Sequence, residues 1–318
     1  VVLESKTGRV LALCSAPDFE PANYREVAEV GVFNNQAIYN AYEPGSVIKT
    51  MTLAAAIEDT VITPSSTYTD SGEIKVGPFT IRNSDGKAHK QQTMTQVLEK
   101  SLNTGAVFAM EQLEGDRFRE FLKSFGFGAV RGIELDTESS GTLDALYKPG
   151  YIYRATASFG QGITATVLQL ALAYNVIANN GVLMKPIIVD EIRRADGSVE
   201  TILPTIVRRV LSEHSAALVS GMLVSVVERG HGKQAGVQGY YVAGKTGTAQ
   251  IPLASGGYDP EATIGTFAGF VPAANPRFTL VVRIDRPKDK KFAEATAAPV
   301  FSEVAKFMLN YYKVPPTR

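Results

Sequence analysis

The chain has 318 residues, of which 45% are hydrophobic and 20% are charged, a composition typical of a globular protein with one large domain or two modest ones. Lysine plus arginine and aspartate plus glutamate number 32 each, and the resulting zero net charge gives no support to binding of nucleic acid or of an anionic membrane. The single cysteine, Cys14, rules out a disulfide within the chain, and because it ends an apolar run we expect a buried thiol.

The first part of the chain predicts a strand pair, a long loop and then a buried helix. Short β-type runs at residues 1–3 and 9–15 flank a hairpin turn, and loop-like sequence continues to about residue 45. Residues 46–58 have almost no polar face, which indicates a helix buried on all sides. Two short strands at 73–76 and 79–82 follow in polar, turn-rich sequence, and helical patterns return at 93–111 and 116–125.

The second part predicts two long helices, a group of strands and a final helix. The helices cover residues 166–178 and 212–228, the strands begin near 240, 263 and 278, and the last helix covers 293–311. Strands at both ends with helices between them favour an α+β fold, in which a mainly antiparallel sheet is flanked by helices. We expect the sheet to come from about 1–45 and 230–318, and a helical lobe from about 60–180.

Histidine-based, metal-based and phosphate-binding chemistry find little support. His89, His214 and His231 lie in or beside polar or glycine-rich sequence, and none accompanies a Gly-x-Ser-x-Gly elbow. The sequence has no His-Glu-x-x-His and no phosphate-cradling loop. We therefore expect solvated histidines and no metal or cofactor.

A serine–lysine pair at the start of the buried helix is the strongest candidate for chemistry. Ser46 and Lys49 are three residues apart, so their side chains share one helix face and can touch. Lys49 could act as a base only if its pKa fell about three units from the reference value, a shift that costs about 4 kcal/mol. Burial in an apolar helix, helped by a nearby cation, can produce a shift of that size.

A second Ser-x-x-Lys at residues 84–87 illustrates how weak the motif is alone, because its Asp-Gly marks a turn and no buried helix follows.

Two other short motifs add to the first. Ser101 and Asn103 lie within the predicted helix 93–111 and supply a hydroxyl and an amide. The hydroxyl could relay a proton, and the amide could hold a peptide group of a substrate.

The last motif is Lys-Thr-Gly-Thr at residues 245–248, on a predicted strand of small residues. Gly247 allows a ligand to approach this strand closely. Lys245, Thr246 and Thr248 suit a carboxylate, and the backbone N–H of Thr248 could serve an oxyanion hole. The similar Lys-Thr-Gly at residues 6–8 lies in the predicted hairpin turn and lacks the final threonine.

Taken together, the motifs follow the order Ser-x-x-Lys, Ser-x-Asn, Lys-Thr-Gly, which is the signature of penicillin-binding proteins and related serine β-lactamases. Over nearly its whole length the chain resembles the transpeptidase domain of monofunctional, class B penicillin-binding proteins. The residues around the motifs resemble this family too: Glu43-Pro44-Gly45, Gly160-Gln161-Gly162-Ile163, Leu168-Gln169-Leu170-Ala171 and Ala249-Gln250.

The resemblance implies a serine D,D-transpeptidase with the fold of penicillin-binding proteins and serine β-lactamases. Ser46 would attack the carbonyl of a D-Ala-D-Ala stem peptide, Lys49 would take its proton, Ser101 would pass a proton to the leaving amine, and Asn103 would bind the substrate amide. The terminal carboxylate would lie against Lys245, Thr246, Gly247 and Thr248. Backbone N–H groups of Ser46 and Thr248 would form the oxyanion hole.

The resemblance also implies partners and a location. Stem peptides would be donor and acceptor, β-lactams would acylate the serine, and membrane glycosyltransferases of the divisome or elongasome would supply glycan strands. The catalytic domain would lie on the outer face of a bacterial cell membrane. Since the first residues form a strand and no stretch approaches the roughly 18 apolar residues of a membrane span, we expect a trimmed chain without the family's anchor and pedestal.

Three alternatives stay open from sequence. A serine β-lactamase would need a base for rapid deacylation, and Glu134 and Glu138 are the carboxylates not excluded. A D,D-carboxypeptidase would differ only in using water as acceptor. A β-lactam sensor domain would be acylated without turnover. Leu102, in the middle of Ser-x-Asn, is often polar in relatives, and we expect it to point away from the catalytic atoms.

Overall fold

The computed structural model describes residues 1–253, 256–288 and 290–318. Its central element is a five-stranded antiparallel sheet with the order β11-β12-β13-β1-β2. Its strands come from the two ends of the chain: β1 (Val2–Glu4), β2 (Val10–Ala12), β11 (Ala243–Pro252), β12 (Tyr258–Val271) and β13 (Phe278–Asp285). The predicted antiparallel sheet is therefore confirmed, with β11 at one edge and β2 at the other.

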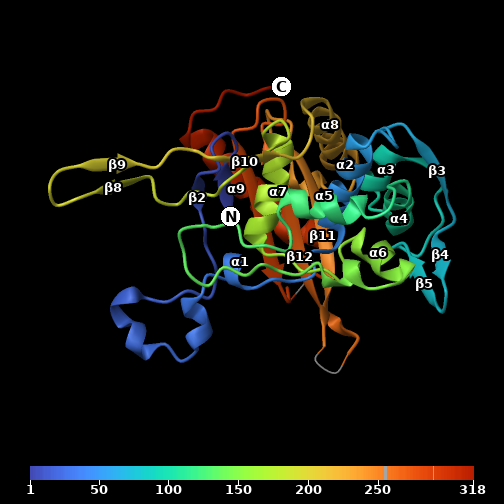
Figure 1. The fold of residues 1–318 in the computed structure, drawn as a ribbon, viewed down its shortest axis with the longest axis horizontal. Coiled ribbons are helices and arrows are strands. Elements are labelled where there is room, and N and C mark those ends of the chain that lie inside the picture. The colour runs from blue at the N-terminus through green and yellow to red at the C-terminus, as the bar shows by residue number, and fades with distance from the viewer. Residues whose placement is uncertain (254–255, 289) are drawn as a thin grey trace.

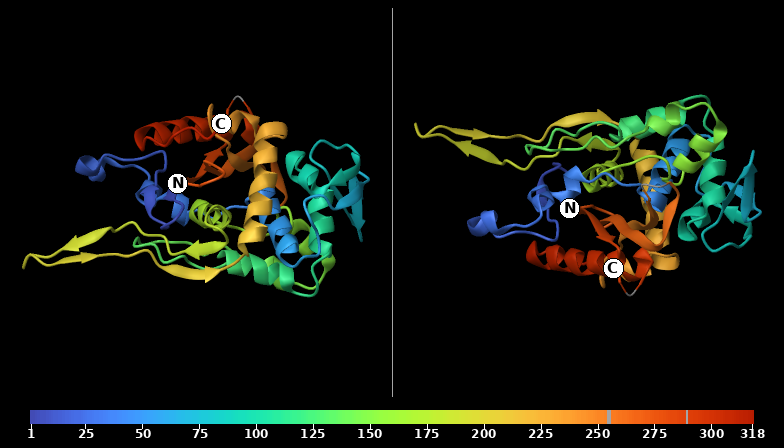
Figure 2. Two further views of the ribbon diagram at one scale, coloured as in Figure 1. Left: turned by 90° about the horizontal axis from the view of Figure 1, so that it is seen from above. Right: turned by 90° about the horizontal axis from the view of Figure 1, so that it is seen from below.

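Helices cover both faces of this sheet (Figure 1, Figure 2). One face packs against α7 (Val167–Ala178) and α8 (Glu213–Arg229), with α2 (Lys49–Glu58) packed against α8, and the other face packs against α9 (Ala297–Tyr311). Alternate residues of β12 supply the two cores, because successive side chains of a strand point to opposite faces. Ala268 and Phe270 join the core around α2 and α7, whereas Phe267 and Val271 join the core under α9.

A lobe of shorter elements lies beside the sheet (Figure 1). Its helices are α3 (Met94–Glu99), α4 (Asn103–Glu111), α5 (Arg117–Phe125) and α6 (Tyr151–Ala157). Its strands form two antiparallel pairs, β3 (Thr67–Asp70) with β6 (Lys90–Thr93) and β4 (Glu73–Val76) with β5 (Phe79–Arg82).

The single helix expected over residues 93–111 is wrong, because the chain breaks between α3 and α4. Ser101 has a positive φ of 56°, a conformation that a helix does not contain. Leu102 then directs its side chain into the core, where it is 1% exposed, and α4 begins at Asn103. The apolar positions on both sides of the break keep a helical spacing, so the sequence pattern continues across it.

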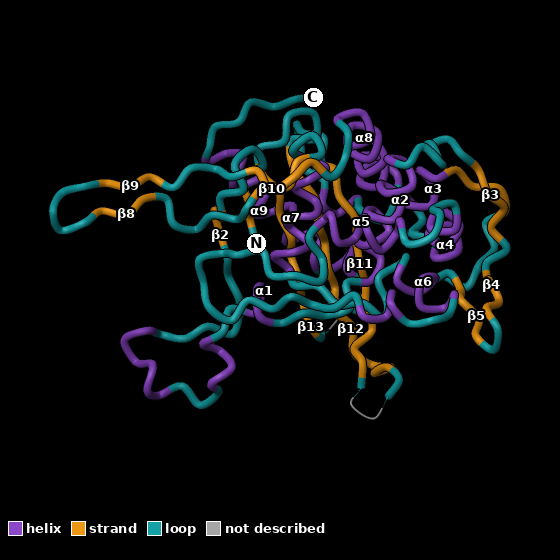
Figure 3. The backbone as a smooth tube through the Cα atoms, viewed as in Figure 1, coloured by secondary structure: helices purple, strands orange, loops and turns teal. Residues whose placement is uncertain are grey.

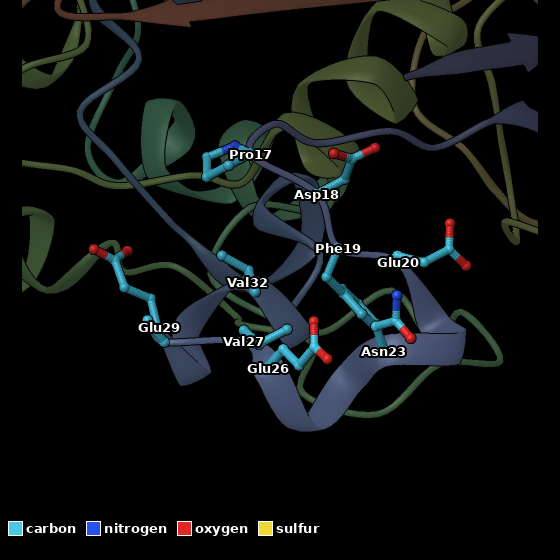
Figure 4. Close-up of a pocket in the computed structure, with 10 residues that line it drawn as sticks. Pro17, Asp18, Phe19, Glu20, Asn23, Glu26, Val27, Glu29 and Val32 are labelled. Atoms are coloured by element: carbon cyan, nitrogen blue, oxygen red, sulfur yellow. The ribbon is translucent and has the colours of Figure 1, made fainter.

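Two segments project from the domain (Figure 3): residues 182–209, for which no element was predicted, and residues 17–33, within the predicted long loop. Residues 182–209 form β7 (Val182–Met184) and β10 (Ile206–Arg209), which pair, and between them an arm of β8 (Glu191–Arg193) and β9 (Val199–Thr201). The other segment, residues 17–33, leads into the short helix α1 (Gln36–Tyr39). It lines an open pocket with acidic and apolar side chains (Figure 4).

The expected burial of Cys14 is also wrong, since its thiol is exposed. The predicted strand 9–15 ends at Ala12 in the structure, where the chain leaves the edge of the sheet and begins the projecting segment. Cys14 therefore lies beyond the last strand residue, in the exposed start of the projecting segment, and the apolar run does not lead to burial.

Candidate active site

Ser46 lies in a tight turn that leads directly into α2. The 3₁₀ helix Gly45–Ile48 precedes the α-helix, and Ser46 is half-buried while its neighbours Val47 and Ile48 are fully buried. The Tyr174 hydroxyl donates a 3.0 Å hydrogen bond to the Val47 carbonyl. The turn is thus fixed from α7, and Ser46 remains partly exposed to solvent.

The loop at Gly160 holds the other side of this turn. The Gly45 N–H donates to the Gly160 carbonyl at 3.2 Å, and a Cβ on Gly160 would collide with the Gly45 backbone. Both glycines also have positive φ angles, of 60° and 85°. The close approach of the two backbones explains why Gly160 must be glycine, whereas at Gly45 the positive φ is what favours glycine.

Lys49 is fully buried and points at the break between α3 and α4. Its Nζ atom donates to the Ser101 carbonyl at 2.5 Å and to the Ser101 hydroxyl at 3.2 Å. The left-handed conformation of Ser101 is what turns both oxygens of this residue toward Lys49. The break that the sequence pattern missed therefore creates the contact between the first two motifs.

The third motif lies on β11, directly against the turn that carries Ser46. A Cβ added to Gly247 would lie 3.0 Å from the Pro44 carbonyl oxygen, so only glycine fits without displacement. Lys245 and Gly247 face the same side of β11, toward α2, and Lys245 is fully buried. Its Nζ atom donates to the Thr246 carbonyl at 3.1 Å.

Thr246 and Thr248 face the other side of the strand. Thr246 is 7% exposed, whereas Thr248 is half-buried. The Thr248 Oγ1 atom accepts a 3.1 Å hydrogen bond from the Ala293 N–H, in the connection between β13 and α9. Because this hydroxyl acts as an acceptor in that bond, its proton can still be donated to a ligand.

The electrostatics of the two lysines favour a neutral amine at Lys49. Burial, and after it the positive charge of Lys245, lower the pKa of Lys49 well below its ordinary value. Burial lowers the pKa of Lys245 to about 7, and the Glu294 carboxylate opposes this shift. Burial and the charge of Lys245 together therefore favour a neutral amine at Lys49, which can accept a proton.

Asn103 is the first residue of α4 and is half-buried. Its side-chain N–H group donates to the Arg82 carbonyl at 2.7 Å, at the end of β5. The amide oxygen then points away from this contact and can accept a hydrogen bond from a ligand. Leu102 is buried in the core, so it points away from the catalytic side chains as expected.

Glu43, three residues before Ser46, belongs to the site although no short motif marks it. Its two carboxylate oxygens accept hydrogen bonds from the Gly162 N–H at 2.9 Å and from the Tyr258 hydroxyl at 3.0 Å. Glu43 therefore connects the loop at Gly162 and the first residue of β12 to the segment that leads into Ser46. The segment 251–262, which joins β11 to β12, thus reaches the site through Tyr258; its residues 254–255 lie outside the described residues.

Other candidates lie apart from this cluster. The Ser-x-x-Lys copy at residues 84–87 forms an exposed turn. Glu138 accepts the N–H groups of Arg131 and Gly132, while Glu134 accepts the N–H of Ile188. These bonds engage both carboxylates that were open as deacylating bases.

The family model for the penicillin-binding protein transpeptidase domain matches residues 1–306. This chain belongs to that family. It is 34% identical over 325 residues to stage V sporulation protein D of Bacillus subtilis, covering all of this chain and 50% of the relative. It is 32% identical to the probable peptidoglycan D,D-transpeptidase PenA of Neisseria flavescens, covering all of this chain and 76% of that protein.

Among solved structures, penicillin-binding protein 3 of Mycobacterium tuberculosis in complex with aztreonam is similar with a TM-score of 0.91 and 32% identity. The match covers all of this chain and 73% of that one. These findings confirm the resemblance to class B penicillin-binding proteins. The penicillin-binding domain spans about half the length of the first curated relatives it matches. In the described part of the chain, no helix has the length and apolar character that crossing a bilayer requires.

Proposed function

We propose that this chain is the catalytic domain of a serine D,D-transpeptidase, which cross-links peptidoglycan stem peptides through an acyl-enzyme on Ser46. The observation that carries the proposal is the position of Lys49, buried one turn from Ser46, bonded to Ser101 and held at a lowered pKa. A lysine in this state can remove the proton of a neighbouring hydroxyl at neutral pH. Several relatives are named peptidoglycan D,D-transpeptidases, which supports the same assignment.

Acylation proceeds in a balanced sequence. The Lys49 amine takes the Ser46 proton as Oγ forms a bond to the carbonyl carbon of the penultimate D-alanine. The backbone N–H groups of Ser46 and Thr248 bind the oxyanion, and one such donor can contribute about 2.7–4 kcal/mol to transition-state stabilisation. The C–N bond to the terminal D-alanine then breaks, and Ser101 passes the proton from Lys49 to the leaving amine.

Substrate binding uses the remaining motif residues. Asn103 accepts the N–H of the substrate amide, and protonated Lys245, with Thr246, Gly247 and Thr248, binds the terminal carboxylate. An amine of a second stem peptide attacks the acyl-enzyme and restores Ser46. β-Lactams enter as donor mimics. In the complete protein we place this domain on the outer face of the bacterial membrane, with a glycan-polymerising partner of the divisome or elongasome.

The fate of the acyl-enzyme separates this function from its alternatives. After brief incubation with benzylpenicillin, we expect intact-protein mass spectrometry to find one adduct that persists for hours, because Glu134 and Glu138 are engaged with backbone groups. An adduct that disappears within seconds while the drug is consumed would instead establish a β-lactamase. Release of D-alanine from a stem peptide with and without an acceptor amine then separates a transpeptidase from a carboxypeptidase or a sensor domain.

The two lysines also predict a bell-shaped pH dependence of acylation. Lys49 must be neutral to act as a base, so the second-order rate constant should rise as pH increases through its lowered pKa. Lys245 must be charged to bind a carboxylate, so the constant should fall as pH passes about 7. Stopped-flow acylation by benzylpenicillin across the pH range measures both limbs.

The matched variant for the alkaline limb is Lys245→Arg, because a guanidinium keeps its charge throughout this range. The limb near pH 7 should then move to higher pH. A profile of the wild-type protein that only rises with pH would show that the charge of Lys245 is not needed.

A further inference from the structure

A buried carboxylate outside the catalytic motifs, Asp70, collects hydrogen bonds at the end of β3. Its side chain is 2% exposed, and burial alone would raise its pKa. Hydrogen bonds to the carboxylate outweigh burial and lower that pKa. The donors are the Thr104 hydroxyl at 2.7 Å, the His89 N–H at 2.8 Å, the Gly72 N–H at 3.0 Å and the Asn83 side-chain amide at 2.9 and 3.1 Å.

These donors belong to four different segments of the lobe. Gly72 lies in the turn after β3, Asn83 follows β5, His89 precedes β6, and Thr104 is the second residue of α4. An ionised carboxylate only accepts hydrogen bonds and offers about four lone-pair sites, so it can serve all of these donors at once. An asparagine at this position would replace one carboxylate oxygen with an NH₂ group. An NH₂ group is itself a donor, so it cannot accept the hydrogen bonds that the oxygen accepts.

Two links lead from this carboxylate to Asn103. The Asn83 side-chain oxygen accepts the Thr104 N–H at 3.3 Å, and the adjacent Arg82 carbonyl accepts the Asn103 side-chain N–H at 2.7 Å. Residues 82–83 and residues 103–104 thus run side by side with two cross-bonds. Asp70 bonds to Asn83 and Thr104, one residue from each end of the Arg82–Asn103 contact.

From this geometry we infer that Asp70 is a positioning residue, which orients the Asn103 amide toward the amide group of the donor substrate. Asp70 does not touch the substrate and acts through Asn83 and Thr104. Because Asn103 accepts the substrate N–H, loss of Asp70 should weaken only those acylating agents that present such an amide. The inference rests on the proposed function, in which Asn103 has that role.

The test compares two β-lactams on the intact domain. Benzylpenicillin carries an acylamino side chain beside its lactam carbonyl, whereas sulbactam carries no side chain there. We expect Asp70→Asn to slow acylation by benzylpenicillin about tenfold, the effect of one misplaced hydrogen bond, and to leave the sulbactam rate within about twofold. Intact-protein mass spectrometry at timed intervals gives both acylation rates. The readout is the ratio of the benzylpenicillin rate to the sulbactam rate, because a general loss of stability would lower both rates and leave this ratio unchanged.

Two further variants keep this test decisive. Tyr68→Phe removes a hydroxyl that lies 3.0 Å from the Thr104 Oγ1 atom in the same buried network, but it leaves every Asp70 bond in place, so the ratio should stay at the wild-type value. If Asp70→Asn does not fold, Thr104→Val removes the Asp70 bond to α4 and should lower the ratio in the same direction. The conservative Thr104→Ser should restore it.

Asn103→Ala separates failure of the inference from failure of the proposed function. If Asn103→Ala lowers the ratio while Asp70→Asn and Thr104→Val do not, Asp70 is a structural residue only and the inference is overturned. If Asn103→Ala itself leaves the ratio unchanged, the role of Asn103 in the proposed function is wrong, and the positioning role of Asp70 is overturned with it. Equal slowing of both β-lactams by Asp70→Asn would likewise contradict positioning.

Discussion

Replacing Ser46 with alanine should abolish the covalent adduct with benzylpenicillin, with acylation falling by about 10⁴-fold or more, because no other hydroxyl replaces a deleted nucleophile. The Ser101 hydroxyl is close, yet it is bonded to Lys49 at 3.2 Å and lies at the helix break instead of the turn beside Gly247. Intact-protein mass spectrometry of Ser46→Ala and of the wild-type protein, at the same drug concentration, measures this loss.

The chain offers a matched control in its second Ser-x-x-Lys. Ser84→Ala deletes a serine hydroxyl in an exposed turn and should leave the rate and stoichiometry of acylation unchanged. If Ser46→Ala were still acylated at the wild-type rate, the adduct would be on another residue and Ser46 would not be the nucleophile. Peptide mapping would then identify the modified residue.

The second large effect is expected for Lys49→Met, which keeps the length of the side chain and removes its amine. Loss of a general base typically slows a reaction by about 10²–10⁴-fold, and we expect the acylation rate to fall within this range. Lys87→Met, in the exposed turn, is the matched control and should acylate like the wild-type protein. If Lys49→Met were acylated at the wild-type rate, Lys49 would be excluded as the base.

The same variant makes a prediction about stability, with a definite sign. The pKa of Lys49 is lower in the folded protein than in the unfolded chain, so the unfolded chain binds more protons between these two values. The free energy of unfolding of the wild-type protein therefore rises with pH across this interval. The methionine variant lacks this contribution, so its stability relative to wild type should be largest at pH below the lowered pKa of Lys49 and should decline as pH rises toward about 10.

Urea unfolding of both proteins at several pH values measures this difference. Loss of the hydrogen bonds to Ser101 changes the free energy of unfolding of the variant by the same amount at every pH. The contribution from protonation of Lys49, by contrast, changes with pH. A difference that does not vary between neutral and alkaline pH would mean that Lys49 remains protonated in the folded protein, which would also contradict its role as the base.

Much of the fold could be predicted because its main elements have strong apolar patterns. Residues of α2 and α7 are apolar on all sides, and in the structure both helices are almost completely buried. The strands β12 and β13 alternate between two cores, which is the pattern that predicted them. The exposed arm of β8 and β9 has no buried face, so burial imposed no pattern that could be read.

The site was predicted as a set of residues, but its geometry was not. Ser46, Lys49, Ser101 and Lys245 could be named because short motifs carry them. The contact between Lys49 and Ser101 depends on a serine in a left-handed conformation, and no glycine or proline marks that position. Glu43 and Asp70 act through bonds to residues distant in the chain, such as Tyr258 and Thr104, which no local pattern reports.

The position of β1 in the sheet has a consequence for how the domain assembles. Val2 of β1 pairs with Leu280 of β13, so the first strand of the domain finds its neighbour only after the helical lobe and most of the sheet exist. By comparison, Lys49 and Ser101 are 52 residues apart. Chains rich in such distant pairings fold slowly. We therefore expect the helical lobe to collapse early, and closure of β1 onto β13 to be a late, slow step of folding.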